Sequence, residues 1–325
     1  MKFCLHLPVF GMYLDPFSET RVNFKELRRM AEIGDEKGFD SLVASDHLVC
    51  IQGSIPPRTF GRDYYHRDIL ESWTVISSIA TITEKMKLSN SVLGNPFRNP
   101  SLLAKMASTL DVISKGRFEL GIGAGWHKDE CISYGIPWPS HKERIERLRE
   151  SVKIIKTLWT EKVANFEGKY YSVTDAYLEP KPVQKPHPPI WFGGPSEAIM
   201  NIVAEMGNGW DISLPPDEVS GKCEALRNKC SEFNRNSDEI TISHMSSVLK
   251  ADDYDSALKR IQPVAEFYGK EVDRLASVHL IGSDRDMVNT VEKFSEAGIN
   301  KLIVCLPQDA NQVKWFCENI ITRFV

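Results

Sequence analysis

Two neighbouring residues, Asp46 and His47, are the sharpest candidates for chemistry in this sequence. They follow a short apolar run that is typical of a buried strand, so they fall at its carboxyl end. A histidine beside a carboxylate can give or accept a proton near neutral pH, which favours an acid–base role for the pair. A second interpretation stays open, in which Asp46 anchors the loop and His47 is a hydrogen-bonded structural residue.

A second candidate is the turn formed by Gly193, Gly194, Pro195 and Ser196. It follows an apolar run at 188–192 and precedes a segment with helical spacing, which predicts a strand, a glycine turn and a helix N-terminus. Exposed backbone N–H groups and the positive end of a helix dipole favour a phosphate at such a turn. A tight turn without a ligand fits the same residues equally well.

Further candidates follow other strand-like runs and are mostly uncharged, aromatic or small. They are His6, Ser91, Val92, Gly125, Trp126, Trp210 and Asp211. Such a set suits a flat heteroaromatic cofactor with a phosphorylated tail better than a metal ion, so we predict no metal site. We interpret Asp129 and Glu130 as helix-capping carboxylates, because acidic residues are favoured in the first turn of a helix.

Strand-like runs alternate with helical segments along the chain, which is the pattern of a parallel (β/α)8 barrel of the α/β class. The runs cover 2–7, 39–44, 86–93, 117–122, 188–192, 209–214, 239–250 and 301–306. In such a barrel the site lies at the carboxyl ends of the strands, where the candidates above fall. An open doubly wound sheet is disfavoured, because its dinucleotide fingerprint should follow the first strand, whereas the glycine-rich turn 121–125 follows the fourth.

Two segments do not fit this alternation. A loop at 48–68 has no period, and an insertion segment at about 165–189 is dense in proline and aromatic residues. We expect the insertion to form a flap or ribbon within a single domain that spans residues 1–325. We expect both segments to line or cover the substrate side, with Phe60, Tyr64 and Tyr65 as candidates for substrate contact. His6, after the first strand-like run, is a further candidate for substrate contact.

Composition excludes several classes of function. The chain has 325 residues, with 40 Lys and Arg against 44 Asp and Glu and a formal net charge of -4. It has no basic block that could follow a nucleic-acid backbone, so a small-molecule substrate is expected. No apolar run approaches the ~20 residues that span a bilayer, and no signal peptide is evident, so no membrane partner is expected. Seven cysteines without a Cys-x-x-Cys pair favour free thiols in the cytoplasm.

Taken together, the motifs resemble those of the bacterial luciferase-like superfamily. The resemblance covers nearly the whole chain, and no single motif is diagnostic, whereas the ordered set is specific. The matching segments are Ser45-Asp46-His47-Leu48, Ser91-Val92-Leu93, Asn95-Pro96-Phe97-Arg98-Asn99-Pro100, 121–130, 166–171, 180–184, 187–194, 207–210 and 279–283.

This resemblance implies a barrel that binds FMN or the deazaflavin F420 at the carboxyl ends of its strands. The Asp-His pair is more similar to the F420-dependent branch, which includes methylenetetrahydromethanopterin reductases, than to the Glu-His of luciferases and many FMN monooxygenases. It implies that Asp46 and His47 lie beside the ring and that Ser91-Val92 forms a non-prolyl cis peptide against it. By the same analogy, residues 193–196 hold the phosphate, and the protein is a homodimer.

We therefore predict an F420-dependent oxidoreductase that transfers a hydride between the deazaflavin C5 and a small organic substrate, with His47 as the proton-transfer residue. An FMN-dependent monooxygenase is the first alternative, and a non-catalytic cofactor-binding member is the second. Trp126 stands where the glucose-6-phosphate dehydrogenases of the superfamily carry a glutamate after the Gly-x-Gly turn, which disfavours a sugar-phosphate substrate.

Overall fold

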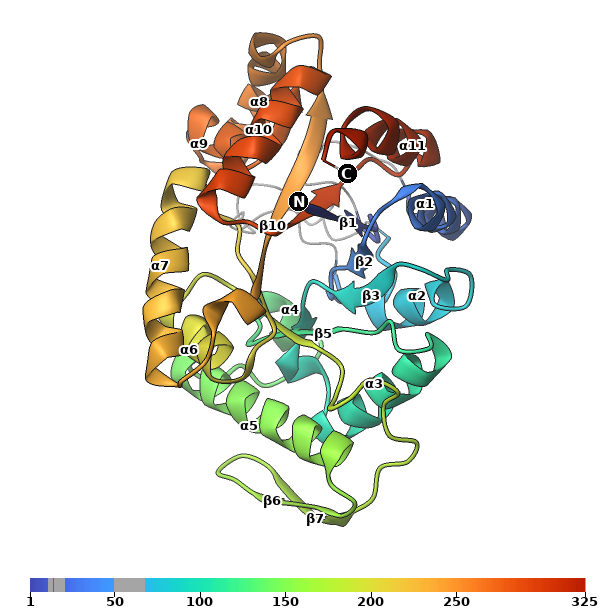
Figure 1. Ribbon diagram of the computed structural model, residues 1–325, viewed down its shortest axis with the longest axis vertical. Coiled ribbons are helices and arrows are strands. Elements are labelled where there is room, and N and C mark those ends of the chain that lie inside the picture. Colours follow the sequence, from blue (N-terminus) through green and yellow to red (C-terminus); the bar gives the residue numbers. More distant parts are fainter. Residues whose placement is uncertain (11–13, 15–20, 50–67, 325) are drawn as a thin grey trace.

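A ring of parallel strands forms the centre of the computed structural model, which describes residues 1–10, 14, 21–49 and 68–324 (Figure 1). In order around the ring, the strands of this part of the chain are β3 (Lys87–Asn90), β2 (Ser41–Ala44), β1 (Lys2–His6), β12 (Lys301–Cys305), β10 (Thr241–Lys250), β9 (Gly209–Asp211), β8 (Ile190–Gly193), β5 (Leu120–Gly123) and β4 (Leu93–Gly94). Backbone hydrogen bonds of 2.9 Å join Leu88 of β3 to Arg117 and Glu119 ahead of β5, and they close the ring. The predicted (β/α)8 barrel is confirmed.

Helices surround this ring (Figure 1). Those of the described chain are α1 (Phe24–Lys37), α2 (Ser72–Ile79), α3 (Pro100–Ile113), α4 (Lys128–Ser133), α5 (His141–Thr160), α6 (Glu197–Met206), α7 (Pro216–Glu232), α8 (Tyr254–Tyr268), α9 (Val272–Ser277), α10 (Asp284–Ala297) and α11 (Ala310–Asn319). Their ends follow from cap chemistry: the Asn23 side chain accepts from Lys25 N at the start of α1, and Gly38 ends it with a φ of 108°. None of these helices is both long and apolar enough to cross a membrane.

Paired charges fill the amino end of the barrel. Lys301, the first residue of β12, places its ammonium 3.3 Å from Asp40, 3.6 Å from Glu119 and 4.5 Å from the centre of the Trp191 ring. Burial lowers the pKa of Lys301, but the neighbouring carboxylates more than offset this effect and leave the pKa raised. Because this cluster occupies the amino end, the carboxyl end is the one that can admit a ligand.

Residues 86–93 form two strands, β3 and β4, rather than the single strand that the sequence predicts. The peptide bond between Ser91 and Val92 is cis and lies at the break. A Cβ added to Gly123 or to Gly193 would lie 2.8 Å from Val92 Cγ2, closer than real Cβ contacts allow. Glycine at these two positions therefore makes room for the Val92 side chain. The sequence also missed β11 (Leu280–Gly282), which pairs with β10, because three residues give no readable period.

The segment 165–189 contains an antiparallel ribbon formed by β6 (Ala164–Glu167) and β7 (Ser172–Ala176). Glu150 of α5 holds it by accepting hydrogen bonds from Lys169 N and Tyr170 N, both at 2.9 Å. The ribbon belongs to the connection from α5 to β8, so it lies at the amino ends of the strands, beside α5 in Figure 1. The expectation that this segment covers the substrate side is therefore not met. The other segment, 48–68, falls largely outside the described residues.

The packing of Val92 against glycine gives a stability prediction. Gly123→Ala should lower the free energy of unfolding by about 1–3 kcal/mol, because the added methyl group must displace Val92. Gly221→Ala is the matched control, since it lies inside α7 with open space around it and should gain about 0.5–1 kcal/mol from helix propensity. Urea unfolding monitored by circular dichroism measures both changes, and equal stability of Gly123→Ala and the parent would contradict the packing argument.

Candidate active site

A cavity of about 820 Å³ opens at the carboxyl ends of the barrel strands, a size typical of small-molecule sites. Most sequence-predicted residues line it: His6, Asp46, His47, Ser91, Val92, Gly125, Trp126, Gly193, Gly194, Pro195, Ser196 and Asp211. Trp210 does not, because its buried indole packs in the core and donates to Gly194 O at 2.8 Å. Phe60, Tyr64 and Tyr65 lie outside the described residues. No cluster of metal-ligating side chains occurs in the described part of the chain.

His47 pairs with a buried carboxylate that is not its sequence neighbour. Its Nδ1 lies 3.0 Å from Glu130 Oε2, and Glu130 is only 2% exposed. Because a carboxylate only accepts hydrogen bonds, Nδ1 carries the hydrogen, and Nε2 has no hydrogen-bond partner among the described residues. The interpretation of Glu130 as a simple helix cap is therefore wrong. Spacing could not reveal this pair, because 83 positions separate the two residues.

The Glu130 carboxylate also orders the loop that carries His47. Its Oε1 accepts hydrogen bonds from the backbone N–H groups of Leu48 and Val49. Burial raises the pKa of Glu130, but the hydrogen bonds from His47 and from these two N–H groups outweigh burial and leave the pKa lowered. Glu130 is therefore ionised at neutral pH and acts as a fixed negative charge behind His47.

Asp46 is committed to a different network. Both of its oxygens accept from Arg98, at 2.6 and 2.9 Å, and the same oxygens accept from Gly94 N and Ser72 Oγ, each at 2.9 Å. The Arg98 guanidinium also donates to Glu71 at 2.6 Å. This geometry fits the anchoring interpretation of Asp46, in which the carboxylate fixes β4 and the strand-end loop.

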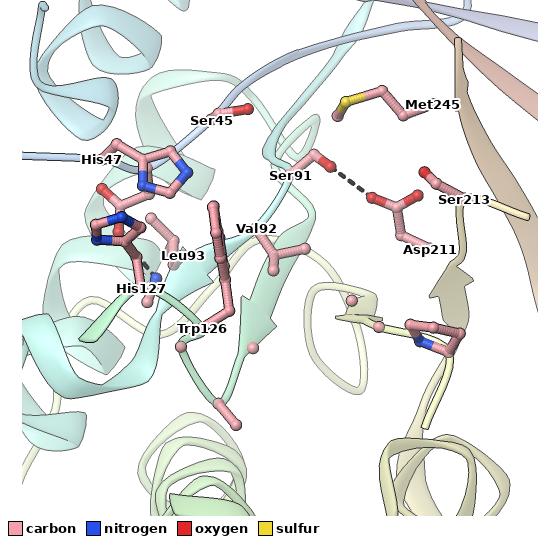
Figure 2. A pocket seen from close by; sticks show the side chains of 18 of the residues that line it. Ser45, His47, Ser91, Val92, Leu93, Trp126, His127, Asp211, Ser213 and Met245 are labelled. Atoms are coloured by element: carbon pink, nitrogen blue, oxygen red, sulfur yellow. Dashed lines mark hydrogen bonds between the residues drawn. The ribbon is translucent and has the colours of Figure 1, made fainter. Parts of the chain in front are cut away.

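Aromatic rings flank His47 at the mouth of the cavity. Phe10 and Trp126 meet its imidazole edge-on, with ring centres at 5.9 and 5.6 Å, and Trp126 is 57% exposed at the rim. Figure 2 shows His47, His127 and Trp126 on one side of the pocket. His127 caps α4 by accepting from Glu130 N at 3.1 Å. Deeper in, His6 Nε2 lies 2.8 Å from Ser45 Oγ, and burial lowers the pKa of His6 to about 4, so this ring is neutral at pH 7.

The cavity extends toward the N-termini of two helices, where anion-binding groups gather. Ser196 caps α6 by accepting from Ile199 N, and Gly194 adopts a φ of 116° that favours glycine. Arg144 of α5 is 9% exposed and stacks over the Trp138 ring at 3.8 Å. One of its guanidinium N–H groups donates to Pro139 O at 2.8 Å, but Nε is buried without a hydrogen-bond partner. Sequence reasoning missed Arg144, although a cation inside the apolar stripe of this helix was a readable signal.

The opposite side of the cavity carries a second carboxyl group, the half-buried Asp211. Ser91 Oγ donates to Asp211 Oδ2 at 2.5 Å, drawn as a dashed line in Figure 2, and Ser243 Oγ donates to Oδ1 at 3.2 Å. Burial raises the pKa of Asp211, although the two serine hydrogen bonds act in the opposite direction. The site thus holds one carboxyl group behind His47 and another across the cavity.

These features define a (β/α)8 barrel with a small-molecule cavity at the carboxyl ends of its strands. The model of the luciferase-like monooxygenase family matches residues 9–304, so the chain belongs to that family and is an enzyme of it. The membership inferred from the ordered motifs is confirmed.

Relatives with known activities include enzymes that depend on F420 and on FMN. The F420-dependent glucose-6-phosphate dehydrogenase of Amycolatopsis mediterranei is 30% identical over 304 residues, which are 86% of this chain and 87% of that enzyme. The FMNH(2)-dependent dimethylsulfone monooxygenase of Pseudomonas putida is 32% identical over 206 residues, 61% of this chain and 53% of that enzyme. The chain thus matches about half the length of the latter enzyme.

Solved structures share the fold at low sequence identity. An F420-dependent secondary alcohol dehydrogenase in complex with an F420-acetone adduct superposes with a TM-score of 0.79 and 20% identity, covering 98% of both chains. The F420-dependent tetrahydromethanopterin reductase of Methanopyrus kandleri gives a TM-score of 0.79 with 18% identity, covering 100% of this chain and 99% of that one.

The Asp46–Arg98 pair gives a second stability prediction. Asp46→Ala should lower the free energy of unfolding by about 3–5 kcal/mol, because it leaves a largely buried guanidinium without its main partner. Arg28→Ala, which breaks an exposed pair with Glu32 on α1, is the control and should cost less than about 0.5 kcal/mol. Denaturant unfolding of both variants checks this, and equal losses would refute the anchoring role.

Proposed function

We propose that this chain is an F420-dependent oxidoreductase acting on a small organic substrate, with His47 as the proton-transfer residue. Bound F420 would supply hydride transfer at its C5. The observation that carries the proposal is the His47–Glu130 pair, which leaves the imidazole Nε2 available at the mouth of a large cavity. The F420-dependent relatives and structural neighbours support this choice of cofactor.

The residues present fit a flat cofactor with an anionic tail. Val92, Leu93, Gly123 and Ala124 give the middle of the cavity an apolar surface suited to a ring system. At the α5 and α6 end, the unpartnered Arg144 Nε and the N-terminus of α6 after residues 193–196 would hold a phosphate. Gly193 has an additional structural reason to be glycine, because it makes room for Val92.

The His47–Glu130 pair can hold and move a proton at a defined atom. With Nδ1–H donated to Glu130, Nε2 can accept a proton from a substrate hydroxyl group, and in the reverse direction it can return the proton. The Glu130 carboxylate stabilises the imidazolium that forms. Phe10 and Trp126 hold the ring between their edges, which limits its rotation. Asp46 contributes by fixing the loop rather than by exchanging a proton.

The monooxygenase relative supports one alternative, in which the same cavity binds FMN and the enzyme activates oxygen. A non-catalytic, cofactor-binding role is the other. The homodimer stays a prediction. A cytoplasmic location also stays a prediction, and the six cysteines that the structure describes fit a reducing compartment because all of them are free thiols.

Cofactor titration separates the first two possibilities. We expect F420 to bind at least about tenfold more tightly than FMN, as measured by fluorescence. Arg144→Leu should weaken F420 binding by a similar factor, because it removes the buried cation at the anion end. Arg147→Leu, one turn further along α5 and outside the cavity lining, should not. Tight FMN binding without F420 binding would replace the deazaflavin assignment with the monooxygenase one.

Turnover tests the role of His47. In a screen of F420H2 oxidation with carbonyls, alkenes, imines and methylenetetrahydromethanopterin, His47→Ala should reduce kcat by at least about 100-fold while F420 affinity is retained. Glu130→Gln should reduce kcat by a smaller factor and should shift the pH–rate profile, because the His47 imidazolium loses its counter-charge. Unchanged turnover in His47→Ala would reject the proton-transfer role, and no turnover in the wild type would favour the non-catalytic alternative.

A further inference from the structure

The carboxyl-end residues of β9, β10 and β12 form one wall of the cavity, here called the β9–β12 wall. It consists of Asp211, Ser213, Met245, Ser247 and Cys305. Figure 2 shows Asp211, Ser213 and Met245 on the side of the pocket opposite His47 and His127, with Val92 between the two groups. The site proposed above uses the His47 side and the anion end, so it leaves this wall without a role.

Asp211 gives the wall its chemical character. Among the described residues, two hydroxyl groups hold its side chain, since Ser91 and Ser243 donate to its two oxygens at 2.5 and 3.2 Å. No lysine or arginine of the described chain lies within ion-pair distance of it, and Lys301 is engaged by Asp40 and Glu119 at the amino end of the barrel. Asp211 is partly exposed to the cavity, and burial raises its pKa.

The two ends of the cavity therefore differ in charge. The described lining carries two cations: Arg144, which is buried at the α5 and α6 end, and Lys270, which is exposed on the turn after α8. An anion brought against the β9–β12 wall would meet a carboxyl group without a counter-ion. Either the two charges repel at low dielectric or one of the groups must take up a proton, and both cost affinity.

We propose that Asp211 makes the β9–β12 wall the substrate-recognition side of the cavity, selecting neutral or cationic molecules that present an O–H or N–H donor and rejecting phosphates and carboxylates. This inference rests on the proposed function, because it takes this cavity to be the catalytic one. A hydroxyl or amine donor can share the Asp211 oxygens with Ser91 and Ser243, whereas an anionic oxygen placed there either meets the Asp211 carboxylate or requires a proton to be taken up, and both outcomes weaken its binding.

Four probes with the same aromatic ring test the proposal: benzyl alcohol, benzylamine, benzoate and phenyl phosphate. Their dissociation constants are measured by NMR on protein loaded with F420 or FMN, whichever it binds. The test of the β9–β12 wall is therefore independent of which cofactor the enzyme uses. Benzyl alcohol and benzylamine should bind at least about tenfold more tightly than benzoate and phenyl phosphate, since one uncompensated charge contact in a partly desolvated site costs that much.

Asp211→Asn should narrow the benzylamine-to-benzoate ratio to less than about threefold, because the amide keeps the shape but not the charge. Ser213→Lys leaves the Asp211 hydrogen bonds in place and adds a positive charge to the wall, so it should narrow the benzylamine-to-benzoate ratio as well. This variant replaces Asp211→Asn as the test if Asp211→Asn folds poorly. Asp252→Asn, exposed on the turn after β10, is the matched control and should leave the ratio unchanged.

The proposal is overturned if benzoate or phenyl phosphate binds the wild type as tightly as benzylamine does. It is also overturned if the ratio survives in both Asp211→Asn and Ser213→Lys, or if none of the probes binds at about 10 mM, the range of very weak ligands. The probe ratios are measured at saturating cofactor in every variant, so that a change in cofactor affinity caused by the altered Ser91 hydrogen bond does not enter them.

Discussion

The packing of the Val92 side chain against two glycines is the constraint on which the cavity depends. Its side chain fits because Gly123 of β5 and Gly193 of β8 have no Cβ to occupy the same space. Hydrogen bonds hold the segment on both sides: Asp46 accepts from Gly94 N, and Asp211 accepts from Ser91 Oγ. Residues from several strands of the ring thus fix one short break in the third strand. That break replaces a continuous strand and places Val92 in the lining of the cavity.

Charge is arranged along the barrel so that each end has a different property. At the amino end, Lys301 and its carboxylate partners form a closed, paired cluster. At the carboxyl end, the charges of the described residues are kept apart. Within this part of the chain, Arg144 Nε has no hydrogen-bond partner, Glu130 pairs with His47, and Asp211 accepts from two serine hydroxyl groups. Since a buried cation with an unsatisfied N–H group is costly, Arg144 supports the carboxyl end as the one built for ligands.

Family membership and site geometry answer different questions about this enzyme. Solved structures share the fold, and the relatives include both F420-dependent and FMN-dependent enzymes. The geometry adds the individual side chains, namely the Glu130 carboxylate behind His47, Trp126 at the rim and Asp211 across the cavity. Substrate choice follows from such residues rather than from the fold, because one barrel supports many reactions through its strand-end side chains.

The sequence alone determined the local elements and their order. Apolar runs marked the ring strands, Asn23 and Gly38 marked the ends of α1, and the strand-end rule collected most of the cavity lining. Tertiary structure decided which residues interact. His47 pairs with Glu130 rather than with Asp46, and Asp46 pairs with Arg98. Tertiary structure also placed Arg144 in the cavity lining and the ribbon of β6 and β7 at the opposite end of the barrel. The physical reason is that residue spacing reports the geometry of one element, whereas contacts between elements depend on strand order, register and the face from which each connection leaves the barrel.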